Sequence, residues 1–166
     1  MPLKNPPLVL LVEDSPDDVD FARRALARSG VAHRLIVAEH GDRALALLTG
    51  AETEPGCDSP WRPALVLLDL NIPGLGGREL LARIKGDPEL CSIPVVIFST
   101  SEHYSDITSC YRAHANSYHV KSDDLLEYQE TARKIMEYWL SAVMRQPGAG
   151  ELSSEATLAA GRQAGL

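Results

Sequence analysis

The segment that most constrains the fold lies near the middle of the chain, where an unbroken apolar run ends on a carboxylate. Residues 64–68 (Ala-Leu-Val-Leu-Leu) show no alternation of apolar and polar side chains, a pattern typical of a parallel strand buried on both faces. One proline and three glycines within residues 73–77 then require a loop before the next helix. Asp69 therefore falls at the carboxyl end of a strand, the edge at which open α/β sheets bind ligands. Taken alone, the segment is also compatible with an Asp69 that only caps a turn.

Strands and helices are predicted to alternate along the whole chain. Four further runs have the composition of short strands, at residues 8–12, 34–38, 93–98 and 117–121. Apolar residues with helical spacing follow each of the five runs, within residues 16–29, 44–50, 80–86, 107–114 and 125–144. This alternation predicts an α/β fold with a five-stranded parallel sheet covered by helices on both faces. The patterns do not order the strands within the sheet.

The start of the first helix is well marked. Ser15 can cap it, Pro16 suits its first position because no N–H is needed there, and Asp18 completes a capping box. The helix is therefore expected to begin directly after Glu13 and Asp14, which end the first strand.

Composition narrows the classes of partner. The chain has 166 residues and a formal net charge of −7, and it has no concentrated basic patch, so no nucleic-acid partner is expected. No apolar run approaches membrane-spanning length and no signal sequence opens the chain, so we expect a cytoplasmic protein without membrane association. The three cysteines lack a CxxC pair and are expected to be free thiols.

Three segments define the expected domain, residues 7–145, and its surroundings. Residues 51–63 form a long connection, interpreted as an insertion loop rather than a functional lid. Residues 146–166 turn to Gly, Ala, Ser and Pro and are expected to be a flexible tail. The helix over 125–144 carries a wide apolar stripe, which indicates either deep burial or contact with a partner. The stripe consists of Ala132, Ile135, Met136, Trp139, Leu140 and Val143.

Chemically active groups gather at the ends of four of the five expected strands. They are Glu13 and Asp14, Asp69, Ser99 and Thr100, and Lys121. In a parallel sheet these ends share one edge, so the three carboxylates of Glu13, Asp14 and Asp69 would repel one another. A hard divalent cation relieves such repulsion, and oxygen ligands with spare water positions favour Mg²⁺.

The same groups suit phosphoryl transfer. A carboxylate such as that of Asp69 is a competent nucleophile toward phosphorus, and the transfer is catalysed chiefly by positioning and electrostatics. Lys121 offers a positive charge to one phosphoryl oxygen, Ser99 a hydroxyl donor to another, and Mg²⁺ can bridge a third to the carboxylates.

These residues together resemble the signature of response-regulator receiver domains. The signature comprises Glu13, Asp14, Asp69, Asn71, Pro73, Ser99, Thr100, Tyr118 and Lys121, and the resemblance covers about residues 7 to 145. It implies a CheY-like, flavodoxin-like doubly wound sheet of five strands in the order 2-1-3-4-5 with five helices; the flavodoxin-like order is a known doubly wound topology. The opening Glu-Asp-Ser-Pro-Asp-Asp and the Trp139-containing last helix are most similar to small stand-alone receivers that partner phytochrome-type histidine kinases.

The resemblance implies a phosphorylation site and a metal site. Asp69 would accept a phosphoryl group from a phosphohistidine of a partner histidine kinase. Asp14 would bind Mg²⁺ directly, Glu13 directly or through water, Asp69 as a further ligand and Asn71 through its backbone carbonyl. An aspartyl-phosphate hydrolase is disfavoured, because it would need an acid/base carboxylate where this chain has Asn71. The protein would thus be no enzyme beyond catalysing its own phosphorylation and dephosphorylation.

The resemblance also implies a switch. Ser99 would move toward the phosphoryl group, Tyr118 would swing inward behind it, and Lys121 would pair with the phosphate. Separately from the resemblance, Thr100 and Ser101 would flank the path of an attacking water, and we hypothesise that they set how long the phosphate survives. Without the resemblance, Tyr118 would be taken for an ordinary core aromatic. The family usually has a proline after the lysine in a cis peptide, and Ser122 stands there in this chain. A non-proline cis bond costs about 3 kcal/mol, so this departure bears on the pose of Lys121.

The expected function is that of a single-domain response regulator. Phosphorylation would change the face formed by the fourth helix, the fifth strand and the fifth helix, and so control partner binding, dimerisation or onward phosphotransfer. The fourth helix pattern is rich in poor helix formers and is predicted to be marginal and mobile. A homodimer through the C-terminal helix is expected from its wide stripe. The alternative is a receiver-like interaction module that works without phosphorylation.

Overall fold

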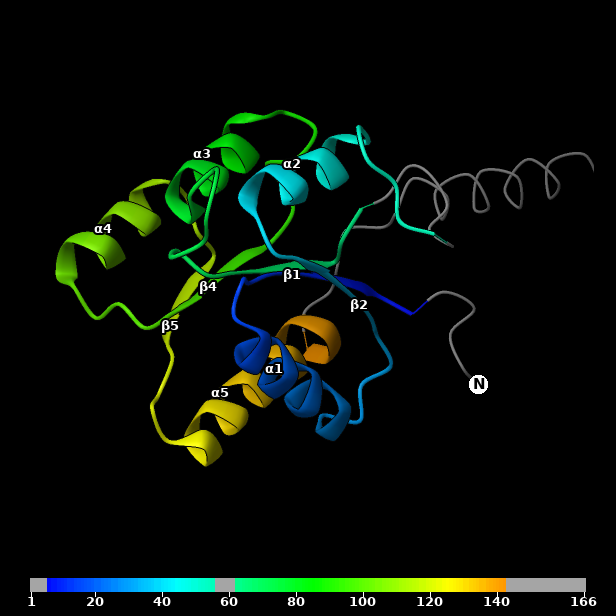
Figure 1. Ribbon diagram of the computed structural model, residues 1–166, viewed down its shortest axis with the longest axis vertical. Helices are drawn as coiled ribbons and strands as arrows, with labels where there is room; N and C mark the ends of the chain where they lie inside the picture. Colours follow the sequence, from blue (N-terminus) through cyan, green and yellow to red (C-terminus); the bar gives the residue numbers. More distant parts are fainter. Residues whose placement is uncertain (1–5, 56–61, 143–166) are drawn as a thin grey trace, which may run out of the picture.

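The computed structural model describes residues 6–55 and 62–142, in which five strands and five helices alternate (Figure 1). The strands are β1 (Leu8–Val12), β2 (Arg34–Ala38), β3 (Leu65–Leu68), β4 (Val95–Ser99) and β5 (Ser117–Val120). The helices are α1 (Pro16–Arg28), α2 (Gly41–Thr49), α3 (Gly77–Gly86), α4 (Tyr104–Arg112) and α5 (Leu125–Glu137), which continues into a π-helical turn η1 (Tyr138–Ala142). The predicted alternation is confirmed.

All neighbouring strands are parallel, and their order is β2-β1-β3-β4-β5. This is the flavodoxin-like order that the resemblance implied, and it is confirmed. The helices α2, α3 and α4 lie on one side of the sheet, and α1 and α5 lie on the other (Figure 1). Both faces of the central strands are thereby covered, which explains why β1 and β3 lack polar alternation.

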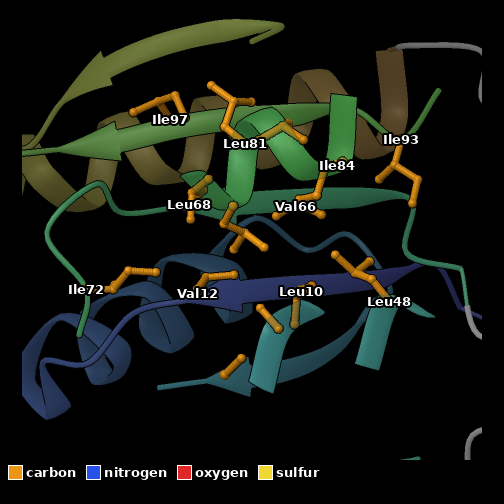
Figure 2. Close-up of a cluster of buried hydrophobic side chains, with 14 of the residues drawn as sticks. Leu10, Val12, Leu48, Val66, Leu68, Ile72, Leu81, Ile84, Ile93 and Ile97 are labelled. Carbon is orange, nitrogen blue, oxygen red and sulfur yellow. The ribbon is translucent and has the colours of Figure 1, made fainter. Parts of the chain in front are cut away.

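Alternate residues of each central strand enter separate hydrophobic clusters. Figure 2 shows the cluster under α2 and α3, to which Leu10 of β1, Leu68 of β3 and Ile97 of β4 contribute. The neighbouring residues Leu11 and Leu67 point to the opposite face and pack with α1 and α5. All four residues of β3 are buried, so its carboxyl end is held from both faces.

The capping box expected at the start of α1 is only half formed. Ser15 Oγ accepts a hydrogen bond from the N–H of Asp18 at 3.3 Å, and Pro16 occupies the first turn as predicted. The N–H of Ser15, however, donates to Glu13 Oε1 at 3.1 Å. The carboxylate of Asp18 bonds Lys121 instead of returning to the cap.

The apolar stripe of the last helix is largely buried within the chain. Ala132, Ile135, Met136 and Leu140 are each at most 5% exposed and pack with α1 and the sheet, and Trp139 packs at their margin. Deep burial is therefore the correct one of the two alternatives for these residues, and the stripe itself leaves little surface for a partner. Val143 and the predicted tail 146–166 lie outside the described residues, as do residues 56–61 of the long connection.

The fourth helix begins earlier than its apolar pattern indicated. α4 starts at Tyr104, after His103, whereas the apolar spacing was recognisable from residue 107. Cys110 is its one buried side chain, so α4 has a small contact with the core. Among the described residues, no helix is long and apolar enough to cross a membrane.

Candidate functional site

Backbone pairing continues past the strands and places the predicted site residues at one edge of the sheet. The N–H of Glu13 donates to Ala38 O at 3.0 Å, that of Asp69 to Val12 O at 3.0 Å, and that of Lys121 to Ser99 O at 2.8 Å. Each residue is thus tied to the neighbouring strand. The parallel register therefore brings Glu13, Asp69, Ser99 and Lys121 to the same edge, as expected.

Lys121 is the centre of the site. Its Nζ lies 2.5 Å from Glu13 Oε2, 2.7 Å from Asp18 Oδ2 and 2.8 Å from Asp69 Oδ2. An ammonium group has three N–H donors, so these three carboxylates use all of them. The side chains of Lys121 and Glu13 are each 3% exposed, that of Asp69 is 9% exposed, and that of Asp18 is 26% exposed.

The site carries more negative than positive charge, and this affects its protonation. Burial raises the pKa of Glu13 from its ordinary value of 4.5 to about 7, against the attraction of Lys121, while the nearby Asp69 carboxylate raises it further. Burial alone would lower the pKa of Lys121, but the attraction of Glu13 and Asp69 outweighs it and raises the pKa above its ordinary value. The ammonium is therefore firmly charged, whereas Glu13 protonates more readily than an ordinary glutamate.

The loop after β3 holds Asp69 in place. The N–H of Asn71 donates to Asp69 Oδ1 at 3.0 Å, so both carboxylate oxygens of Asp69 have partners. The chain then folds back so closely that a Cβ on Gly77 would lie 2.3 Å from Asp69 O and 2.6 Å from Leu70 Cα. A glycine at the start of α3 is therefore required for this loop to pass the end of β3.

Three of the predicted residues are not among the side-chain partners of the Lys121 ammonium, which are Glu13, Asp18 and Asp69. Asp14 is exposed and lines a surface cavity of about 280 Å³ beside α1, which Glu13 also lines. Ser99 is fully buried, and its Oγ accepts from the N–H of Ser101 at 3.5 Å. Thr100 is exposed and lines a second surface cavity of about 570 Å³, which Lys121 also reaches.

Asp18 is the site residue that sequence reasoning missed, because its position explained it fully as part of a cap. It lies in the first turn of a helix that starts at the same sheet edge, so its side chain can reach the neighbouring strand ends. This second acidic position, four residues after Asp14, was the available signal.

Tyr118 belongs to a chain of polar contacts that leads away from the site. Its hydroxyl donates to Ser101 O at 2.8 Å, and Ser101 Oγ donates to Asp106 Oδ2 at 2.6 Å. Asp106 in turn pairs with Arg78 at 2.5 Å. The contacts connect β5, the β4–α4 loop, α4 and the first turn of α3, and we call them the Tyr118–Arg78 chain.

The donor set at the sheet edge fits a hard divalent cation. Glu13, Asp18 and Asp69 each offer a carboxylate oxygen, and these oxygens lie within 4.8 Å of one another. Oxygen donors of this charge are those that Mg²⁺ or Mn²⁺ takes. Lys121 compensates only one of the three charges, so a cation would be attracted to the site.

Comparisons with known proteins agree with the fold. The model of the response regulator receiver domain matches residues 9–133. Response regulator Rcp1 of Synechocystis sp. is 39% identical over 140 residues, which are 84% of this chain and 93% of Rcp1. The structure of the phosphorylated cyanobacterial phytochrome response regulator RcpA is 40% identical, with a TM-score of 0.78 over 85% of this chain and 99% of RcpA. The structure of the Mn²⁺-bound form of response regulator Rcp1 is 37% identical, with a TM-score of 0.78 over 86% of this chain and all of that one (100%).

Proposed function

Because the chain belongs to the response regulator receiver family, we propose that it accepts a phosphoryl group on Asp69 from a partner histidine kinase. The observation that carries the proposal is the buried Asp69 carboxylate at the end of β3, 2.8 Å from the Lys121 ammonium. The likeness to phytochrome response regulators supports a kinase of the phytochrome type as the partner.

The transfer is a displacement at phosphorus. A carboxylate oxygen of Asp69 forms the new O–P bond, the P–N bond to the kinase histidine breaks, and the imidazole leaves with the electron pair and takes up a proton. Lys121 Nζ is already within hydrogen-bond distance of Asp69 and is placed to donate to an oxygen of the transferred group.

The proposed cation is Mg²⁺, and it would neutralise charge on the incoming phosphoryl group. We assign Glu13, Asp14, Asp69 and the backbone carbonyl of Asn71 to it. The close approach of the Glu13 and Asp69 carboxylates supports this assignment. Asp14 is exposed and lines the same surface cavity as Glu13, and it would reach the cation from there.

Phosphorylation would then act on the face formed by α4, β5 and α5. Ser99 and Thr100 would contact the phosphoryl group, and Tyr118 would respond through its hydrogen bond to the Ser101 carbonyl. In the described part of the chain, every large hydrophobic side chain that is exposed lies on α4, α5 or η1, which suits a face that binds partners. They are Tyr104, Tyr111, Leu125, Leu126 and Tyr138.

Further parts of the proposal concern the molecule as a whole. The receiver would extend over residues 7–145, work in the cytoplasm and leave residues 146–166 as a tail. Within residues 125–142, a homodimer through the C-terminal helix would have to use exposed residues such as Leu126 and Tyr138, because the described part of the apolar stripe is largely buried.

Intact-mass spectrometry with acetyl phosphate and Mg²⁺ tests the proposal. The native chain should gain one phosphoryl group only when Mg²⁺ is present, and Asp69→Asn should gain none. Asp87→Asn is the matched control, because Asp87 also accepts a hydrogen bond from the N–H two residues later, at 2.8 Å, but lies in an exposed turn. It should be phosphorylated like the native chain. No adduct on the native chain, together with no binding of beryllofluoride, would favour the phosphorylation-independent module.

A further inference from the structure

We propose that Asp18 is a positioning residue for Lys121. Before phosphorylation, its carboxylate holds one N–H of the Lys121 ammonium, and this N–H passes to the phosphoryl group once Asp69 carries one. The inference rests on the proposed phosphorylation of Asp69. It adds Asp18 to the site, together with a change in the hydrogen-bond partners of Lys121.

The backbone of Asp18 is anchored on both sides, and this fixes the point from which its side chain reaches Lys121. Its N–H donates to Ser15 Oγ at 3.3 Å, and its carbonyl accepts from the hydroxyl of Tyr128 at 3.3 Å. Tyr128 belongs to α5 and is 4% exposed, so α1 and α5 together fix where the carboxylate begins. From there, Oδ2 reaches Nζ at 2.7 Å.

The three contacts of Lys121 leave no donor for a new ligand. The N–H that bonds Asp69 can pass to the phosphoryl group formed on it. Because an ammonium has three N–H groups, Lys121 can donate a second N–H to that group only if Glu13 or Asp18 is released. Asp18 is 26% exposed, against 3% for Glu13 and 9% for Asp69, so water can solvate the released carboxylate of Asp18 best. A buried carboxylate that loses its partner remains unsatisfied, which costs more. Asp18 is therefore the partner that Lys121 gives up.

Replacing Asp18 with Asn should affect the two ligands of the site in opposite directions. The change removes the carboxylate charge, which weakens a contact that exists only before phosphorylation and ends a repulsion of the phosphoryl group, so both effects favour binding of a phosphoryl mimic. The same loss of charge weakens the attraction for Mg²⁺. General damage to the site would instead weaken both ligands.

The experiment is a pair of titrations on the full chain, followed by NMR of backbone amides. Beryllofluoride is titrated at saturating Mg²⁺, and Mg²⁺ is titrated alone. Asp18→Asn should tighten beryllofluoride binding by about threefold to tenfold, the range expected for one hydrogen bond, and should weaken Mg²⁺ binding. Asp18→Glu should restore the native order of affinities. Asp17→Asn is the matched control, since Asp17 is an exposed carboxylate in the same helical turn, and it should change neither affinity.

The outcomes separate this inference from the proposed function. If the native chain binds beryllofluoride and Asp18→Asn binds it equally or more weakly, the inference is wrong while the proposed function stands. If the native chain does not bind it, the proposed function and the transfer of the N–H fail together. In either case, the ammonium signal of ¹⁵N-labelled Lys121 reports on the contact before phosphorylation. Its protons should exchange faster in Asp18→Asn than in Asp17→Asn, and equal rates would overturn the role of Asp18.

Discussion

At the scale of single residues, the site is an excess of buried negative charge around one ammonium group. Glu13, Asp18 and Asp69 share Lys121, so one carboxylate is compensated and the others depend on hydrogen bonds, protons or a cation. Glu13 is the most buried of the three, and the desolvation of its charge raises its pKa, so its protonation state responds to pH.

The first prediction concerns the stability of the metal-free protein as a function of pH. The pKa of Glu13 rises from 4.5 to about 7 on folding, so its contribution to stability is complete below pH 4.5 and is lost as the pH rises through about 7. The Glu13→Gln variant has no titrating carboxyl at this position, so its stability does not fall in this way. In EDTA, the free energy of unfolding of the native chain should therefore fall relative to Glu13→Gln by about 1–3 kcal/mol between pH 5 and pH 8.

Urea denaturation at several pH values measures this difference. Asp14→Asn serves as the control, because Asp14 is the exposed neighbour of Glu13 and should leave the native pH dependence in place. Parallel curves for the native chain and Glu13→Gln would show that burial does not shift the protonation of Glu13.

Most of the site could be predicted residue by residue, and the exception has a physical cause. Glu13, Asp69 and Ser99 follow apolar residues directly and Lys121 follows a short strand, and parallel strands bring residues at their carboxyl ends to one edge. The contact of Asp18 with Lys121 depends on how α1 packs against α5, where Tyr128 meets its carbonyl. Packing between helices 110 residues apart in sequence leaves no local pattern.

At the scale of elements, the Tyr118–Arg78 chain couples the site to the helices beside it. It passes from β5 to the loop after β4 and then to α4 and α3. α4 has only Cys110 in the core, so these polar contacts are a large part of what holds its first turn. An element attached in this way can shift without unpacking the core.

The second prediction is that breaking the polar contacts of the Tyr118–Arg78 chain loosens α4. Arg78→Ala and Ser101→Ala should speed amide hydrogen exchange in α4, by about twofold to fivefold for the half-exposed Arg78 pair and up to about tenfold for the Ser101 hydrogen bond. Hydrogen exchange followed by NMR gives the rates. Arg83→Ala is the control, since Arg83 pairs with Glu79 on the exposed side of the same helix α3 and should leave α4 unchanged. Equal rates of amide hydrogen exchange in α4 for all variants would mean that the contacts of the Tyr118–Arg78 chain do not restrain this helix.

At the scale of the whole molecule, the patterns predicted the number and type of elements but not how the sheet orders them. The runs at residues 8–12 and 65–68 are apolar on both faces. This pattern indicates central strands but does not show which strands pair with them. The order β2-β1-β3-β4-β5 depends on where the crossover helices pack, and that is decided by the two clusters on either side of the sheet. It could be expected only from the resemblance of the site residues to a known family.

The apolar stripe of α5 shows a related limit of sequence patterns. Its width suggested a surface for a partner, but Ile135, Met136 and Leu140 turn inward against α1 and the sheet. A sequence pattern gives the width of an apolar face and not how much of it the rest of the chain covers. Here α1 covers what a single sheet face would have left open.

The last prediction concerns the oligomeric state. If the homodimer forms through the described part of the C-terminal helix, it must use the apolar side chains that remain exposed there, of which Leu126 is 73% and Tyr138 is 58% exposed. Light scattering at tens of micromolar should then give twice the chain mass of 18.0 kDa, and Leu126→Glu with Tyr138→Glu should give the single mass, because charges there cannot be buried without partners. Glu130→Gln is the control, because Glu130 is exposed on α5 and pairs within its own helix. A single mass for the native chain, with and without acetyl phosphate, would assign the exposed side chains to a different partner.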